Sequence, residues 1–242
     1  MDMTAIIAVI LAFIIKGMCG FANTLVFSTI ISFKTNNINI TPVELIVGYP
    51  SNIFIAWKER KWISAKVCIP LSILVIIGSI PGVLFLKNGN TQLLKTLFGF
   101  AVVLLGIEML FRERRKAKKK SSKISLVIIG ILSGILCGLF GIGAFLVAYI
   151  SRTIENQDQF RGNICVVFLV ENSFRIILYS LTGILNVTIF KRALLLIPFM
   201  IIGLSIGILL SKKVSEKMVK KVVIILLILS GMALIINNIG FR

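Results

Sequence analysis

The sequence contains no histidine, and charged residues make up only 15% of its 242 positions. Without histidine, Ser-His and Cys-His nucleophiles are excluded, and any proton relay must use carboxylates. The four cysteines stand singly in apolar stretches without CxxC spacing, so we interpret them as packing residues rather than metal ligands. We therefore expect no catalytic residues, no metal and no cofactor, in a protein that is not an enzyme.

Hydrophobic residues make up 57% of the chain, which is too many for a water-soluble surface. The net charge of +18 comes from cations in short loops beside apolar runs, where Lys and Arg mark the cytoplasmic side, so nucleic acid is not an expected partner. We predict an all-α polytopic membrane protein whose partner is the lipid bilayer. Its apolar runs, most of them long enough to cross hydrocarbon, are 4–33, 38–57, 67–86, 93–111, 124–151, 164–185, 193–210 and 222–239.

An internal repeat divides these eight runs into two halves. The halves correspond in the same order at "GMCGFANTLV" and "GLFGIGAFLV", at "YPSNIF" and "LVENSF", at one GxxxG motif each, and at "LLKTLFGFAVVLLG" and "MVKKVVIILLILSG". Duplicated halves are common in transporters. We predict a first membrane repeat at 1–111, a basic cytoplasmic linker at 112–123 and a second membrane repeat at 124–242.

The charges of the loops favour inverted repeats. Eight full crossings would place 15 Lys and Arg inside and 10 outside, leaving out Lys16 and Arg175 within the membrane. If the first run of each half breaks at its glycines and returns to its own side, the count becomes 19 inside and 6 outside. The positive-inside rule favours the second arrangement, in which the halves have opposite orientation and both termini are extracellular.

The glycines at these two breaks are the first candidate binding residues. Glycine lowers helix propensity by about 1 kcal/mol relative to alanine, which permits a break that a leucine-rich run would resist. The free N–H groups at the start of a half-helix form an anion site. The alternative is close helix packing through small residues. We predict substrate binding at Gly17, Gly20, Asn23, Gly138, Gly141 and Gly143.

Polar residues inside the apolar runs are the second set of candidates, because their burial in the membrane is costly. Asn52 and Asn172 recur in both halves, and their amides suit either an oxyanion or an interhelical hydrogen bond. Glu171 and Arg175, spaced i, i+4, either neutralise each other or open during transport. In the second case Arg175 binds the anion and Glu171 is the proton-coupling candidate.

Lys16 stands just before the first break, and Glu44 lies near Pro42 at the entrance of an apolar run. We expect Lys16 either to draw anions toward the first break or to extend to the membrane interface. For Glu44 we expect interfacial solvation only.

The glycine-opened halves, the asparagine in each second segment and the basic central loop resemble the sulfite exporter TauE/SafE family, also called the TSUP transporters. The clearest stretches are "GILSGILCGLFGIGAFLV" and "FRGNICVVFLVENSFRIILYSLTG". The resemblance implies a multi-pass carrier in the bacterial inner membrane that moves sulfite, sulfonates or related small anions, coupled to the proton gradient. It assigns no oligomeric state.

The first glycine motif departs from the family pattern. Phe21, Ala22 and Asn23 stand where members usually keep glycines, and Ala144 replaces a glycine in the second motif. These departures favour, as an alternative, a membrane scaffold or accessory subunit that keeps the fold without transporting.

Overall fold

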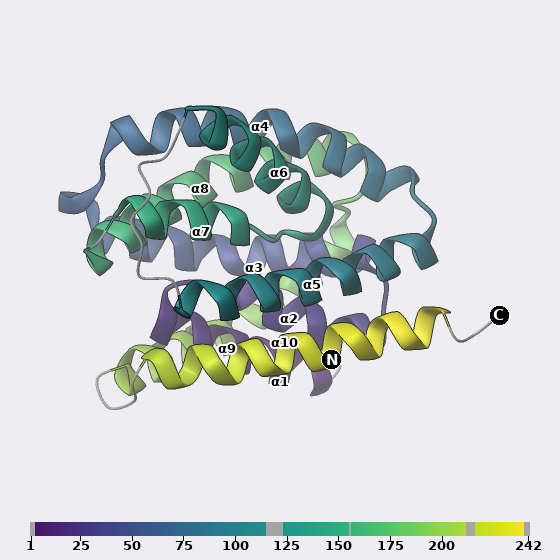
Figure 1. The fold of residues 1–242 in the computed structure, drawn as a ribbon. Helices are drawn as coiled ribbons and strands as arrows, with labels where there is room; N and C mark the ends of the chain where they lie inside the picture. Colours follow the sequence, from purple (N-terminus) through teal and green to yellow (C-terminus); the bar gives the residue numbers. More distant parts are fainter. Residues whose placement is uncertain (1–2, 115–122, 155, 212–215, 240–242) are drawn as a thin grey trace.

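The structure, a computed structural model, describes residues 3–114, 123–154, 156–211 and 216–239, and these residues form helices without any strand. The all-α expectation is confirmed (Figure 1). Of the expected linker, only its two ends are described, 112–114 in α5 and 123 in α6. The α-helices are α1 (Met3–Cys19), α2 (Asn23–Ser32), α3 (Asn37–Lys58), α4 (Ala65–Asn88), α5 (Thr91–Arg114), α6 (Lys123–Phe140), α7 (Ala144–Thr153), α8 (Gln157–Leu181), α9 (Val187–Leu210) and α10 (Glu216–Ile239).

Both predicted breaks are present. The first run is divided between α1 and α2, and the fifth between α6 and α7. Gly20 and Gly141 have φ angles of 83° and 74°, in the left-handed region that glycine adopts without steric cost. Ala22, also within the first break, has a φ of 76°, a conformation that costs an alanine roughly 1–2 kcal/mol. The departure from glycine in the first motif therefore leaves the break intact.

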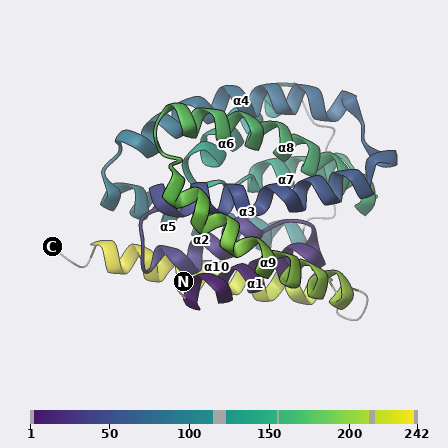
Figure 2. The ribbon, with the colours of Figure 1, turned by 180° about the vertical axis from the view of Figure 1, so that it is seen from behind.

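Two pairs of helices are held together by glycines, and each pair joins the two halves of the chain. Helix α4 packs on α6, where a Cβ atom on Gly78 or Gly134 would meet the backbone of the partner helix. Helix α9 packs on α1, with Gly203 facing Ile10 and Gly207 facing Ile14. Close backbone approach through small residues is typical of helices in membranes. Figure 2 shows α9 alongside α1 from behind.

Two further pairs of packed helices, α5 with α10 and α3 with α8, are antiparallel. Helix α5 packs on α10 with Gly99 near Ile235 and Gly106 near Ile228, so the numbers rise in opposite directions. Helices α3 and α8 are antiparallel as well. The hydroxyl groups of Tyr49 and Ser173 lie 2.8 Å apart, and the backbone of Glu59, at the end of α3, lies close to Gly162 near the start of α8. In each of these two pairs, the helices therefore run in opposite directions.

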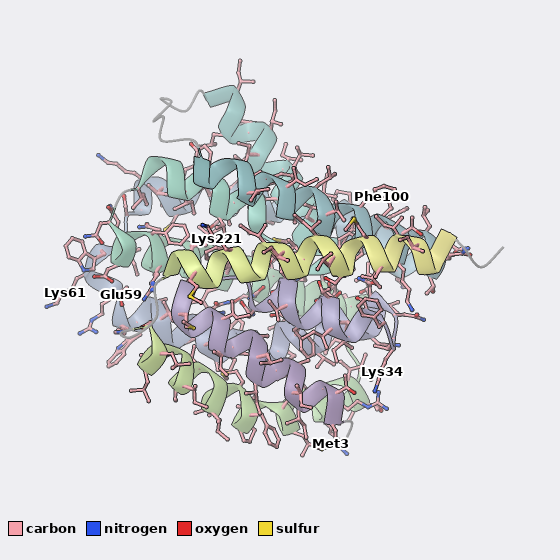
Figure 3. All side chains as sticks on the ribbon, turned by 60° about the horizontal axis from the view of Figure 1, so that its bottom comes forward. Met3, Lys34, Glu59, Lys61, Phe100 and Lys221 are labelled. Carbon is pink, nitrogen blue, oxygen red and sulfur yellow. The ribbon has the colours of Figure 1, made fainter. Side chains whose placement is uncertain are left out.

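The outside of the bundle is apolar. Large hydrophobic side chains are exposed along its helices, among them Ile124, Leu181 and Ile236, an arrangement that suits contact with lipid. Among the described residues, four helical segments are long and apolar enough to cross a membrane, namely 65–88, 91–108, 158–181 and 187–210. Glu59 and Lys61 lie at one end of the bundle, and Lys34 lies toward the opposite end (Figure 3).

The buried apolar residues form two cores. The smaller one joins α1, α2, the first half of α3 and α9. The larger one contains buried residues of α4, α5, α6, α7, α8 and α10. Each core therefore combines elements of both halves, and α3 lies between them.

Candidate functional site

Four ionisable side chains come together inside the bundle. Lys16 from α1, Glu44 from α3, and Glu171 and Arg175 from α8 line one cavity and are at most 4% exposed. The space in this cavity that the centre of a water molecule can occupy is about 20 Å³, enough for roughly one water molecule. Two cations and two carboxylates share this small volume. Asn23, Thr24, Gly48, Asn52, Gly141, Phe168 and Asn172 complete the lining.

Arg175 has the most contacts in this site. Its Nε lies 3.3 Å from Oε1 of Glu171, and its Nη2 donates a hydrogen bond of 2.8 Å to Oδ1 of Asn172. Its Nη1 donates to the backbone carbonyl of Cys137, in the last turn of α6. One turn further along α8, the hydroxyl group of Tyr179 donates to the carbonyl of Gly138 at 3.0 Å. Helix α8 thus supplies donors to two carbonyls in the last turn of α6. The carbonyl of Cys137 also accepts a hydrogen bond of 2.8 Å from the N–H of Gly141.

Lys16 lies on the other side of the cavity. Its Nζ donates a hydrogen bond of 2.7 Å to Oδ1 of Asn52, and only 2% of the residue is exposed. The alternative in which Lys16 extends to the membrane interface is therefore wrong. Asn52 and Asn172, the two residues that the repeat aligns, each accept a hydrogen bond from a buried cation through the side-chain oxygen. In a carboxamide this directs the NH₂ group, the donor that an anion requires, away from the cation.

Glu44 lies inside the bundle and not at the interface predicted from the sequence. It is 4% exposed and lines the cavity, so the expectation of interfacial solvation is wrong. Its Oε1 accepts a hydrogen bond of 2.5 Å from Nδ2 of Asn23, the first residue of α2. Its Oε2 lies close to Gly141 at the second break. The carboxylate of Glu44 therefore connects the two breaks.

The two breaks also meet directly. A second small cavity is lined by Phe21, Ala22, Asn23, Thr24 and Leu25 of the first break and by Gly141, Ile142, Gly143 and Val147 of the second. It shares Asn23, Thr24, Gly141 and Phe168 with the charged cavity. No side chain caps the start of α2 or of α7, so the first N–H groups of both helices lack a side-chain acceptor there.

The predicted glycines have different positions. Gly141 lines both cavities, and Gly143 lines the one between the breaks. Gly20 is approached by the side chain of Arg161, whose Nη2 donates to the carbonyl of Met18 at 3.1 Å. A Cβ atom on Gly17 would meet the backbone of α9, and one on Gly138 would meet the backbone of α4. Close helix packing, the alternative given above, describes these last two positions.

A third cavity adjoins the site through Lys16. It is lined by Gly20, Lys58, Glu59 and Arg161, among others. Figure 3 shows Glu59 at the end of the bundle that also carries Lys61. Lys16 lines both this cavity and the charged one, so its ammonium group stands between them. Arg161 and Thr24 are not predicted from the sequence, because their surroundings depend on helices that are distant in the sequence.

The described residues include no group of three His, Cys, Asp or Glu side chains that could hold a metal ion. Cys68, Cys137 and Cys165 are buried and unpaired by disulfides. Glu171 has an unusual environment for a buried carboxylate. Apart from its ion pair with Arg175, neither of its oxygens accepts a hydrogen bond from the part of the chain that the structure describes.

An apolar helical bundle with interrupted helices and an enclosed group of ionised side chains has the architecture of a membrane transport protein. Comparison with protein families supports this class and names the particular one. Residues 5–234 match the family described as Sulfite exporter TauE/SafE, and the chain belongs to this family. Its members are membrane transporters and not enzymes. No curated protein and no solved structure gave a match. The resemblance found in the sequence is confirmed.

Proposed function

We propose that this protein is a secondary transporter that moves small anions such as sulfite or sulfonates across the bacterial inner membrane, coupled to protons. The observation that carries this proposal is the enclosed cavity in which Arg175 and Lys16 lie beside two broken helices. Buried cations in a membrane protein usually mark the path of a substrate or ion. Interrupted helices near the midplane are the usual place for substrate in secondary transporters.

An oxyanion entering this cavity has several donors available. The planar guanidinium group of Arg175 can bind two oxygens of a sulfite or sulfonate group, which Lys16 cannot do. The NH₂ groups of Asn52 and Asn172 and the free N–H groups at the starts of α2 and α7 add neutral donors. Gly20, Asn23, Gly141 and Gly143 belong to the two breaks, and Gly17 and Gly138 keep the adjoining helices in place.

Glu171 is the proton-coupling candidate in this scheme. In the empty site its carboxylate is stabilised by the ion pair with Arg175. When a divalent anion binds Arg175, Glu171 loses part of this stabilisation, and its oxygens have no other hydrogen-bond donor among the described residues. A buried carboxylate without a counter-ion takes up a proton. Anion binding and proton uptake are thereby linked.

The two halves, 1–111 and 124–242, act as inverted repeats joined by the basic linker 112–123. This interpretation is supported by the antiparallel directions of α3 and α8 and of α5 and α10. Because α1 packs tightly on α9 and α4 on α6, the bodies that move in alternating access are bundles that combine both halves. One contains α1, α2 and α9, and the other contains α4, α6, α7 and α8.

Reporter fusions test the membrane orientation. A reporter placed after Lys217 is expected to lie in the cytoplasm, and one placed after Arg242 outside the cell, because inverted halves put the cation-rich loops inside. The measurement is the activity of a reporter pair in which one enzyme works only in the cytoplasm and the other only outside it. The opposite locations would overturn the inverted arrangement, leaving the family assignment in place.

Flux into liposomes tests transport itself. Purified protein reconstituted in liposomes is expected to give saturable uptake of labelled sulfite or methanesulfonate when a proton gradient is imposed. Liposomes without protein, and gradients abolished by a proton carrier, serve as controls. Protein that is folded but moves none of a panel of sulfite, sulfonates and small carboxylates would favour the scaffold alternative.

A further inference from the structure

Glu44 is the one ionised side chain of the site to which the proposed function gives no role. Its Oε1 accepts the hydrogen bond from Asn23, and its Oε2 lies 3.4 Å from the position that a Cβ atom on Gly141 would occupy. The Nη1 of Arg175 lies at the same distance from that position. The carboxylate therefore already lies among Asn23, Gly141 and Arg175, three residues that the proposed function assigns to the substrate.

The charges of the site are balanced without a substrate. Lys16 and Arg175 supply two positive charges, and Glu44 and Glu171 supply two negative ones. The groups that face Glu44 are Lys16 from α1, the thiol of Cys137 from α6, and Glu171 and Arg175 from α8. An anion added to this neutral group would place an unpaired charge in a buried site, which is costly. A proton must accompany it.

We propose that the carboxylate of Glu44 is a built-in anion that occupies the substrate's place in the empty transporter and gives it up only when Glu44 is protonated. This inference rests on the proposed function and deepens it. The proton passes from water to an oxygen of Glu44 and forms an O–H group. The amide of Asn23 and the guanidinium of Arg175 then donate to the substrate oxyanion, and no covalent bond to the substrate forms.

The exchange conserves charge. One proton on Glu44 compensates one monovalent anion, so the site is neutral before and after binding. A second proton on Glu171 would compensate a divalent anion in the same way. Protons and anions therefore enter the site together, and the number of protons follows the charge of the substrate.

Binding of methanesulfonate as a function of pH tests this role. This sulfonate keeps a single charge over the measured range, so any pH dependence arises from the protein. Isothermal titration calorimetry on the full-length protein in lipid nanodiscs, between pH 5.5 and 8, is expected to give an affinity that falls as the pH rises. The fall reaches about tenfold per pH unit for each proton taken up with the anion.

The variant Glu44→Gln imitates the protonated side chain. It is expected to lower the slope of log Kd against pH by one proton relative to the natural sequence, and to bind at least tenfold more tightly at pH 8. Glu171→Gln should keep the contribution of Glu44. Asp158→Asn makes the same carboxylate-to-amide change at an exposed position at the start of α8 and should keep the full slope.

A Glu44→Gln protein with the slope of the natural sequence would overturn the inference, and it would leave anion transport by the unaltered protein standing. If the variant does not fold, titrations of the natural sequence in two buffers with different heats of ionisation give the protons taken up per anion. Uptake of at least one proton supports the proposal, and no uptake overturns it. If no anion binds to the natural sequence at any pH, both the inference and the proposed function fail.

Discussion

Replacing Arg175 by methionine is expected to abolish anion flux and to lower the free energy of unfolding by about 3–5 kcal/mol, the usual cost of leaving one member of a buried ion pair without its partner. The loss of stability arises because Glu171, at a fully buried position, loses its counter-ion and must take up a proton from water to remain buried. The carbonyl of Cys137 also loses the guanidinium donor and keeps only the N–H of Gly141. Uptake of sulfite by liposomes and thermal unfolding of the purified protein measure the two effects.

A double variant separates binding from folding. Replacing both members of a buried ion pair by apolar residues of similar size is often neutral or stabilising. Arg175→Met combined with Glu171→Met is therefore expected to regain most of the lost stability, except for the part that depends on the carbonyl of Cys137. Flux should stay absent, because the anion has lost its bidentate partner. A double variant that unfolds like the natural protein and transports at its rate would show that Arg175 only serves to stabilise the fold.

The helix breaks could be predicted from the sequence because their cause is local. Gly20 and Gly141 take positive φ angles at the breaks, and each lies in a glycine-containing motif inside an overlong apolar run. The spacing of Glu171 and Arg175 on one helix likewise predicts their ion pair. In each case the interacting residues lie within a few positions of one another.

Other features of the site depend on helices that are distant in the sequence. Glu44 lies two residues after a proline near the start of an apolar run, where solvation is the ordinary expectation. It is buried because α2 and the second break cover it, bringing Asn23 and Gly141 to its two oxygens. The one available signal was the isolation of this carboxylate, because the nine residues before Glu44 and the thirteen after it carry no charge.

Gly17 and Gly138 are predicted from the sequence to bind substrate, but they pack against other helices. Both belong to motifs that contain true break residues, and composition alone does not distinguish a glycine that faces a ligand from one that faces a helix. Their partners are α9 and α4, each contributed by the other half of the chain. The exchange of helices between halves therefore decides which glycines of a motif are available to a substrate.

Gly141→Ala is expected to reduce anion binding and flux at least tenfold, with a loss of stability of roughly 1–2 kcal/mol from the positive φ angle of 74°. The added Cβ atom would lie 3.0 Å from Cγ2 of Thr24 and 3.4 Å from both Arg175 and Glu44, so it would occupy the space between the substrate donors.

Gly183 provides a matched control for the backbone strain. Its φ angle is also 74°, and a Cβ atom there would have no neighbour within 4 Å. Gly183→Ala is therefore expected to lose a similar free energy of unfolding and to retain normal flux. Calorimetric binding of methanesulfonate and uptake by liposomes compare the two variants at equal amounts of folded protein. If both alanines reduced flux equally, the effect at Gly141 would be one of helix geometry alone. A selective loss at Gly141 places the anion at the second break, because only there does the added methyl group meet the donors.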